Sequence, residues 1–236
     1  MPPRTPLRDA GGFYRDLPDW AARIRTPLLV GAGSVALVVV AYYAVSLAVA
    51  EFASGTVVVD NPAYPGDRVC DSFVDRDRSH SSCSEPATVE RTQSAVLSEA
   101  VWNLGSTLSL GTFMSAVGAA IVIGSASFKY HGRKTVVNSL HVAAWGTVPF
   151  ALALSLNAPI IGYMVLQGDV PADVGDVYGR YAPLMGVTMI GATLWATYLW
   201  YAGTRLLHDF SDRQATITAG GLFVSAVALT FGLYGV

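Results

Sequence analysis

The stretch TPLLVGAGSVALVVVAYYAVSLAVA, residues 26–50, contains no charged residue. A helix rises 1.5 Å per residue, so a bilayer core about 30 Å thick needs about 20 apolar residues to cross it. Four later stretches of similar or greater length also lack Asp, Glu, Lys and Arg: 100–128, 135–168, 181–204 and 214–236. Inside a bilayer, backbone groups must hydrogen-bond within a helix. The sequence therefore predicts an all-α, polytopic membrane helix bundle with five transmembrane helices.

The composition supports a membrane location. Of 236 residues, 52% are hydrophobic and only 14% are charged, and the mean hydropathy is +0.43. These values are unusual for a soluble domain. We expect a multi-pass protein of the cell membrane that is surrounded by the lipid bilayer and has no nucleic-acid partner.

Lys and Arg are distributed unevenly over the predicted connections. Ten of the fifteen basic residues lie before the first span, between spans two and three, or between spans four and five, whereas twelve of the seventeen acids lie in the other two connections. The positive-inside rule then places the N-terminus in the cytoplasm and the C-terminus outside. The predicted organisation is a cytoplasmic segment 1–25, a transmembrane helix 26–50, an extracytoplasmic loop 51–97 and a four-helix membrane region 98–236.

A cleaved signal peptide is the alternative for the first segment, since Ala48 and Ala50 form an A-x-A arrangement. The uncharged run of 26–50 is longer than the 7–15 residues of a signal core. A transmembrane helix is therefore favoured.

The predicted external loop contains RVCDSFVDRDRSHSSC, residues 68–83, with the only cysteines of the chain, Cys70 and Cys83. Two cysteines in one extracytoplasmic loop favour a local disulfide. The alternatives are unpaired thiols and a metal site that would add His80 and a nearby Asp, although the spacing fits no common zinc pattern. We expect no metal.

Residues for catalysis are not evident. No acidic or basic residue lies in the middle of a predicted span, which argues against a coupled transporter. The sequence has no H-E-x-x-H, G-x-S-x-G or phosphate-loop motif. We expect no enzymatic activity and no cofactor. Pro149 predicts a helix kink that shapes the bundle, and the alternative is a broken helix along a transport path.

Two further patterns concern packing. Gly111, Ser115 and Ala119 recur at four-residue spacing, which lets helix backbones approach closely. Trp195, Trp200 and Tyr201, toward the end of the fourth span, are typical of anchors at the membrane interface.

A charged island, RLLHDFSDR, occupies residues 205–213 between the last two spans. Arg205 and His208 are three residues apart and would share a face if the helix continued. We hypothesise that Arg205, His208 and Ser211 form a cytoplasmic hydrogen-bonding surface, which either locks this turn against the 129–134 turn or engages a partner. Arg213, just before the last span, is expected to anchor that span at the headgroups.

The stretch LWYAGTRLLHDFSDRQA, residues 199–215, resembles the closing signature of the Yip-domain family of Ypt/Rab-interacting membrane proteins. Two further stretches fit in order, SFKYHGRKTVVNSLHVAAW (127–145) and AAWGTVPFAL (143–152), so that the resemblance covers about 120–225. Asp209 stands where the family often has Gly. The Asp-Leu-Tyr-Gly stretch of eukaryotic members is missing before the first span, so the similarity is to a prokaryotic-type member. The matching positions are Trp195 or Trp200, Gly203, Arg205, His208, Ser211, Arg213 and Ala215.

The resemblance implies five spans, a cytoplasmic N-terminus and an external C-terminus, in agreement with the charge distribution. It identifies Gly203, Arg205, His208, Ser211 and Arg213 as a candidate cytoplasmic interaction turn. The expected function is that of a non-enzymatic organiser or interaction scaffold of the membrane, whose partner is an unidentified membrane protein or a second copy of the chain. The alternative is a small transporter or channel, as a homo-oligomer.

Overall fold

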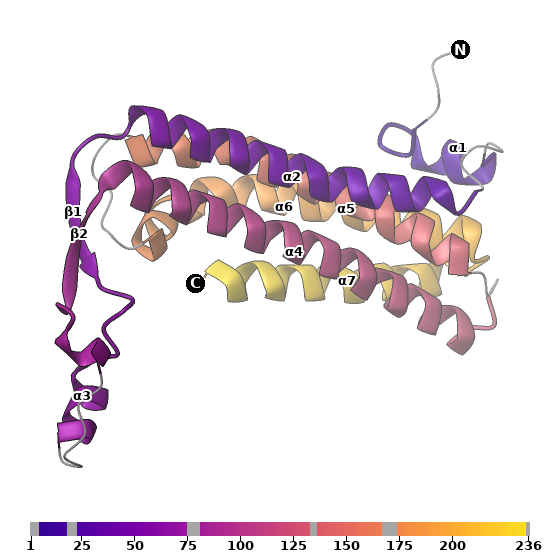
Figure 1. Ribbon diagram of the computed structural model, residues 1–236. Coiled ribbons are helices and arrows are strands. Elements are labelled where there is room, and N and C mark those ends of the chain that lie inside the picture. The colour runs from indigo at the N-terminus through magenta and orange to yellow at the C-terminus, as the bar shows by residue number, and fades with distance from the viewer. Residues whose placement is uncertain (1–4, 18–22, 75–80, 133–135, 167–173, 235–236) are drawn as a thin grey trace.

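The computed structural model describes residues 5–17, 23–74, 81–132, 136–166 and 174–234. Five long helices run side by side, and a short helix lies at one end of them (Figure 1). A hairpin projects from the other end. In chain order the elements are α1 (Ala10–Arg15), α2 (Arg25–Phe52), β1 (Thr56–Asp60), α3 (Asp67–Val74), the 3-10 helix η1 (Ser81–Ser84), β2 (Thr88–Thr92), α4 (Gln93–Lys129), α5 (Val136–Leu166), α6 (Val174–Leu207) and α7 (Asp212–Tyr234).

The predicted helical architecture is confirmed, and each uncharged stretch corresponds to one long helix. Within the described residues, three helices, α2, α4 and α5, are long and apolar enough to cross a membrane. Their outward-facing side chains include large apolar residues such as Leu29, Val40 and Ile121, each more than 60% exposed. Such a surface is unfavourable in water and suits a lipid environment.

Two apolar clusters hold the bundle together. One lies in the half nearer the hairpin, where α2, α4, α5 and α6 meet around Tyr42, Leu108 and Met185. There α2 and α4 approach closely at Gly105, since a Cβ at this position would overlap the side chain of Tyr42. The other cluster lies in the half nearer α1. It contains side chains of α1, α4, α5, α6 and α7, with Phe13 and Trp200 among the largest.

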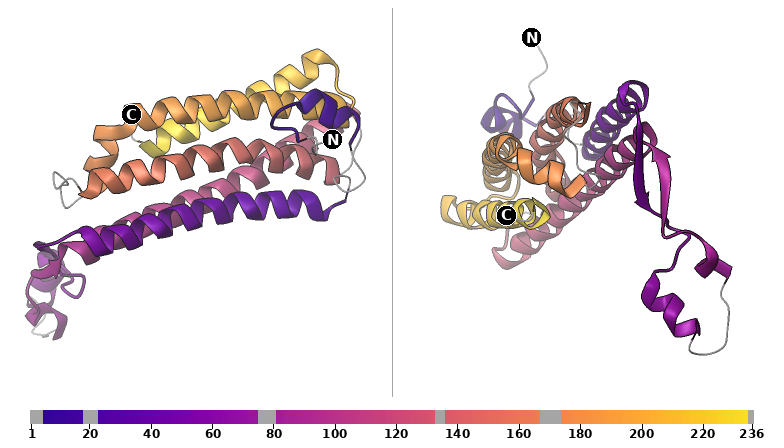
Figure 2. Two further views of the ribbon diagram at one scale, coloured as in Figure 1. Left: turned by 90° about the horizontal axis from the view of Figure 1, so that it is seen from above. Right: turned by 90° about the vertical axis from the view of Figure 1, so that its left-hand side faces the viewer.

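The hairpin was not predicted, because the loop sequence showed no alternation of apolar and polar residues. β1 pairs with β2 in an antiparallel register from Thr56 opposite Thr92 to Asp60 opposite Thr88. β2 runs directly into α4, which begins at Gln93, before the predicted end of the loop at residue 97. The hairpin, α3 and η1 form an arm, described for residues 53–74 and 81–92, that extends away from the bundle in Figure 1 and in the right-hand view of Figure 2.

A disulfide joins Cys70 of α3 to Cys83 of η1, with a Cα–Cα distance of 5.6 Å. This pairing is the one favoured by the sequence. Cross-linking a loop of this length stabilises the folded arm by about 3 kcal/mol in the chain-entropy description. A second contact holds the two ends of this loop together next to the strands. Asn61, just after β1, donates its side-chain Nδ2 to the carbonyl of Pro86, just before β2, at 2.8 Å.

Replacing both cysteines, as Cys70→Ser with Cys83→Ser, should loosen the arm and leave the bundle intact, because the disulfide lies outside both apolar clusters. Limited proteolysis of purified protein should cut the variant within residues 61–87 at least about tenfold faster, in keeping with a loss of about 3 kcal/mol. The thermal midpoint of the bundle should stay unchanged. Equal cleavage rates of variant and parent would contradict this role of the disulfide.

Candidate functional site

The candidate site lies at the end of the bundle that carries α1, which we call the α1 end. The α4–α5 connection and the α6–α7 turn meet there (Figure 1). α6 ends at Leu207, and the next N–H, of His208, still bonds to the carbonyl of Thr204 at 3.2 Å. Asp209 then takes a positive φ of 54°. This left-handed conformation commonly ends helices and favours Gly, and here it is adopted by an Asp.

His208 is fully buried and joins the turn to α4. Its Nδ1 lies 2.7 Å from Oγ of Ser127. The Ser127 hydroxyl also donates to the carbonyl of Ile123 at 2.9 Å. A hydroxyl has a single proton, so the imidazole Nδ1–H donates to Ser127 Oγ in this arrangement. A hydrogen bond between two buried side chains so far apart in sequence fixes the end of α6 against the end of α4.

Close backbone contacts reinforce this joint. A Cβ at Gly132 would lie 2.5 Å from the carbonyl oxygen of His208 and 2.6 Å from the ring of Phe210, so the glycine lets the two connections touch. The rings of Tyr130 and Phe210 pack edge to face, with centroids 5.5 Å apart. From α5, Asn138 Nδ2 donates to the carbonyl of Leu207 at 2.8 Å and satisfies the end of α6.

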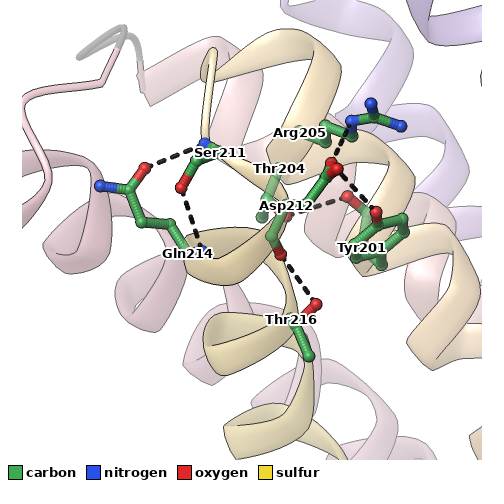
Figure 3. A network of polar contacts seen from close by, with 7 residues as sticks. All are labelled: Tyr201, Thr204, Arg205, Ser211, Asp212, Gln214 and Thr216. Atoms are coloured by element: carbon green, nitrogen blue, oxygen red, sulfur yellow. Dashed lines mark hydrogen bonds and ion pairs between the residues drawn. The ribbon is translucent and has the colours of Figure 1, made fainter.

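The start of α7 has a cap of its own. The backbone N–H of Ser211 donates to Gln214 Oε1 at 2.9 Å, and the N–H of Gln214 donates to Ser211 Oγ at 3.4 Å (Figure 3). This reciprocal arrangement is a capping box. Gln214 was missed in the sequence, although the S-x-x-Q pattern before an uncharged run is a legible signal. Ser211 therefore contributes to the start of α7.

The charged side chains of the turn face outward. Arg205 Nε lies 2.6 Å from Asp212 Oδ1, and both side chains are at least half exposed. Tyr201 donates its hydroxyl to the same carboxylate oxygen at 3.3 Å (Figure 3). Arg213 is also exposed. An exposed ion pair contributes only about 0–1 kcal/mol to stability, so the fold depends little on these groups.

The structure thus separates the residues of the predicted interaction turn. The side chain of His208 is buried in the bundle. Gly203 lies on the inner side of α6, because a Cβ there would be 2.6 Å from Val142 of α5. Arg205, Ser211 and Arg213 lie on the exposed side. Arg205 is exposed whereas His208 is fully buried, so the two side chains do not share one exposed surface. Arg133 and Lys134, of the 129–134 turn, lie outside the described residues.

The structure corrects the expectation for Trp200, while the kink at Pro149 stays a prediction. Trp200 is only 4% exposed and packs against Gly146 of α5, so its interpretation as an interfacial anchor was wrong. Pro149 is buried within α5, and the helix continues through it to Leu166. Within the described residues, no group of three or more His, Cys, Asp and Glu side chains is placed to hold a metal ion.

The short helix α1 is the part of the α1 end that the sequence did not predict. Asp9 caps it by accepting the N–H of Gly12 at 2.8 Å. Phe13 is fully buried and packs edge to face on Trp145 of α5, with centroids 5.7 Å apart. Tyr14 is 2% exposed, and burial raises the pKa of its phenol. α1 thereby covers the joint between α5 and α6.

Apolar helices with lipid-facing side chains and interlocked connections define a helical integral membrane protein. The chain belongs to the Yip1 domain family, since the model of that family matches residues 7–234. The match includes α1, α2 and the arm, beyond the region in which the sequence showed a resemblance. No curated protein and no solved structure matches the chain.

The joint between the turns can be tested by a double-mutant cycle on Ser127 and His208. Ser127→Ala should lower the free energy of unfolding by about 1–3 kcal/mol, because it leaves a buried imidazole N–H without its acceptor. The double variant Ser127→Ala with His208→Ala should cost less than the sum of the single variants. Thermal unfolding in detergent measures each step.

Ser106→Ala is the matched control for this cycle. Ser106 also lies in α4 and also bonds to a carbonyl of its own helix, that of Trp102 at 3.0 Å, but it is exposed. It should change the unfolding free energy by less than about 0.5 kcal/mol. Additive costs for Ser127 and His208 would show that the two side chains are not coupled.

Proposed function

We propose that the protein is a non-enzymatic organiser of the cell membrane that works as an interaction scaffold. It spans the membrane five times, with the N-terminus in the cytoplasm and the C-terminus outside. Its partner is another membrane protein or a second copy of the chain. The exposed side of the α6–α7 turn, formed by Arg205, Ser211, Asp212 and Arg213, is the docking surface.

The packing of α6 and α7 supports five spans. α6 packs along α5, and α7 packs along α6. The long axes of both helices run roughly alongside those of the three apolar helices (Figure 1). Outward-facing side chains of α6 and α7 are apolar at Val187, Ile190, Leu194, Ile217 and Val224, each more than half exposed. Helices of 34 and 23 residues are long enough to cross the hydrocarbon core.

One observation carries the docking surface: the buried hydrogen bonds and the helix cap of the turn involve neither exposed arginine. His208 and Asn138 fix the end of α6, and the Ser211–Gln214 cap fixes the start of α7. Arg205 and Arg213 remain accessible on this rigid turn. Arginines held in a fixed position recognise carboxylate groups with defined geometry, so a partner with acidic residues near the membrane surface suits this turn.

The topology can be tested by labelling single cysteines with an impermeant thiol reagent, in a background that lacks Cys70 and Cys83. Ala172→Cys should react from outside intact cells. Ser211→Cys should react only after the cytoplasm is opened, because α6 would separate the two positions. Labelling of both positions from the same side would show that α6 does not cross.

The docking surface can be tested with Arg205→Gln combined with Arg213→Gln. This variant should lower the recovery of the partner in mild detergent, or the fraction of homo-oligomer, by about tenfold, which corresponds to about 0.7 kcal/mol for each exposed charge. Insertion and thermal stability should stay unchanged. Oligomeric mass by light scattering and quantitative mass spectrometry give the two readouts.

Arg68→Gln combined with Arg91→Gln is the matched control. These arginines are exposed on the arm, and Arg91 forms an ion pair with Glu99 at 3.1 Å whose side chains are about as exposed as those of Arg205 and Asp212. The control should retain full association. Equal association of all variants, or solute flux through vesicles containing the purified parent, would contradict the scaffold proposal and favour a transporter or channel.

A further inference from the structure

An apolar groove of about 780 Å³ opens on the side of the bundle between α2 and α4, with α5 as its floor. Its walls are built from α2 between Pro27 and Val40 and from α4 between Thr112 and Val117. The floor is α5 between Leu140 and Thr147. These three helices are the ones that are apolar enough to cross a membrane, so the groove faces lipid.

The groove is a wedge that is closed at one end. Near the hairpin, α2 and α4 are in contact, because Gly105 of α4 accommodates the ring of Tyr42. Toward the α1 end the two helices separate, as Figures 1 and 2 show from two directions. The floor of α5 is uncovered where they diverge. The groove therefore opens toward the α1 end and closes near the middle of the bundle.

This shape fits a lipid chain better than a transmembrane helix. From Pro27 to Val40 the wall is about 20 Å long, at 1.5 Å per residue. One leaflet of the hydrocarbon core is about 15 Å thick, half of about 30 Å. The wall is therefore long enough to hold one acyl chain of a single leaflet and too short to span both leaflets. A partner helix must continue through the second leaflet, where the contact of Tyr42 with Gly105 blocks its path.

The open end of the groove is positively charged. Arg23 and Arg25 are exposed and immediately precede Pro27, the first residue of α2 that lines the groove. Lys129 ends α4 at the same end of the bundle. Guanidinium groups at the level of the headgroups bind phosphate through charge-assisted hydrogen bonds.

We propose that the groove is a binding site for one anionic phospholipid of the leaflet at the α1 end. One acyl chain fills the groove down to the contact of Tyr42 with Gly105, and the phosphate lies against Arg23 and Arg25. The site is independent of the docking surface on the α6–α7 turn and of whether α6 and α7 cross the membrane. By filling the wedge, the lipid supports α2 and α4 where they do not contact each other.

The site can be tested with photoreactive lipid in vesicles of phosphatidylcholine that contain the purified full chain. The probe is phosphatidylglycerol with a diazirine at the end of one acyl chain, and the same photoreactive chain on phosphatidylcholine serves as the neutral probe. After irradiation, peptide mass spectrometry should find the anionic probe on α2 near Val40 and on α5 near Thr147. The neutral probe should label these peptides at least about fivefold less.

Ala36→Phe should block the groove, because Ala36 is an exposed residue of its wall. Ala44→Phe is the matched control: Ala44 is equally small, exposed and in the same helix, but it does not line the groove. Labelling should be lost in the first variant and kept in the second. Should Ala36→Phe fail to give a monodisperse protein, Ala32→Phe tests the same wall.

Arg23→Gln combined with Arg25→Gln should reduce anionic labelling by about fivefold for each arginine, from about 1 kcal/mol per basic residue near the membrane surface. Arg8→Gln combined with Arg15→Gln removes the same charge from α1 and the turn that precedes it, at the same end of the bundle, and should have little effect. Three results would overturn the proposal: equal labelling by both probes, labelling of Ala36→Phe at the parent level, or cross-linking of the groove to another protein chain in place of lipid.

Discussion

The hydrocarbon core of a bilayer contains no water, so each polar group within it must find a partner inside the protein. This constraint explains where the polar contacts of this chain lie. Hydroxyl groups within the long helices bond to carbonyls of their own helix, as Ser109 does to Gly105 at 2.7 Å and Thr193 to Met189 at 2.7 Å. Between the helices, contact is mostly apolar. Side-chain hydrogen bonds between helices include those at the α1 end, where Ser127, Asn138 and His208 join the connections.

Close contact between helices depends on small residues at particular places. Gly105 receives Tyr42 in the half near the hairpin, and Gly146 and Gly203 bring α5 and α6 together near the α1 end. Gly132 does the same for two connections rather than two helices. Interhelical attraction in lipid comes largely from such packing, because lipid is as apolar as the side chains themselves. In the wedge between α2 and α4, Gly31 has no atom within 4 Å of where its Cβ would be, so it makes no such close approach.

The number of long helices was predictable because a stretch of more than 20 residues without a charge is typical of a membrane helix in a chain of this composition. The bounds were less so, because α4 and α6 begin seven residues before their uncharged stretches, at Gln93 and Val174. Individual contacts were not predictable. Gly111, at the start of the small-residue stripe, has no atom within 4 Å of where its Cβ would be, whereas Gly105 carries the close approach. Sequence spacing shows which residues share a face but not which face meets a neighbour. The burial of His208 depends on where α6 ends, and Asp209 obscured that position because an αL residue is usually Gly.

The arm has a consequence for how the protein is made. Its contacts are local: the strands pair within residues 56–92, and the disulfide spans 13 positions. Local contacts form quickly and need no distant segment. Synthesis proceeds from the N-terminus, so the arm can be complete before α5 leaves the ribosome. β2 continues into α4 without an intervening residue, so the arm and the start of α4 form one continuous segment. Both cysteines precede Gln93, so the residues that close the arm are synthesised before the first residue of α4.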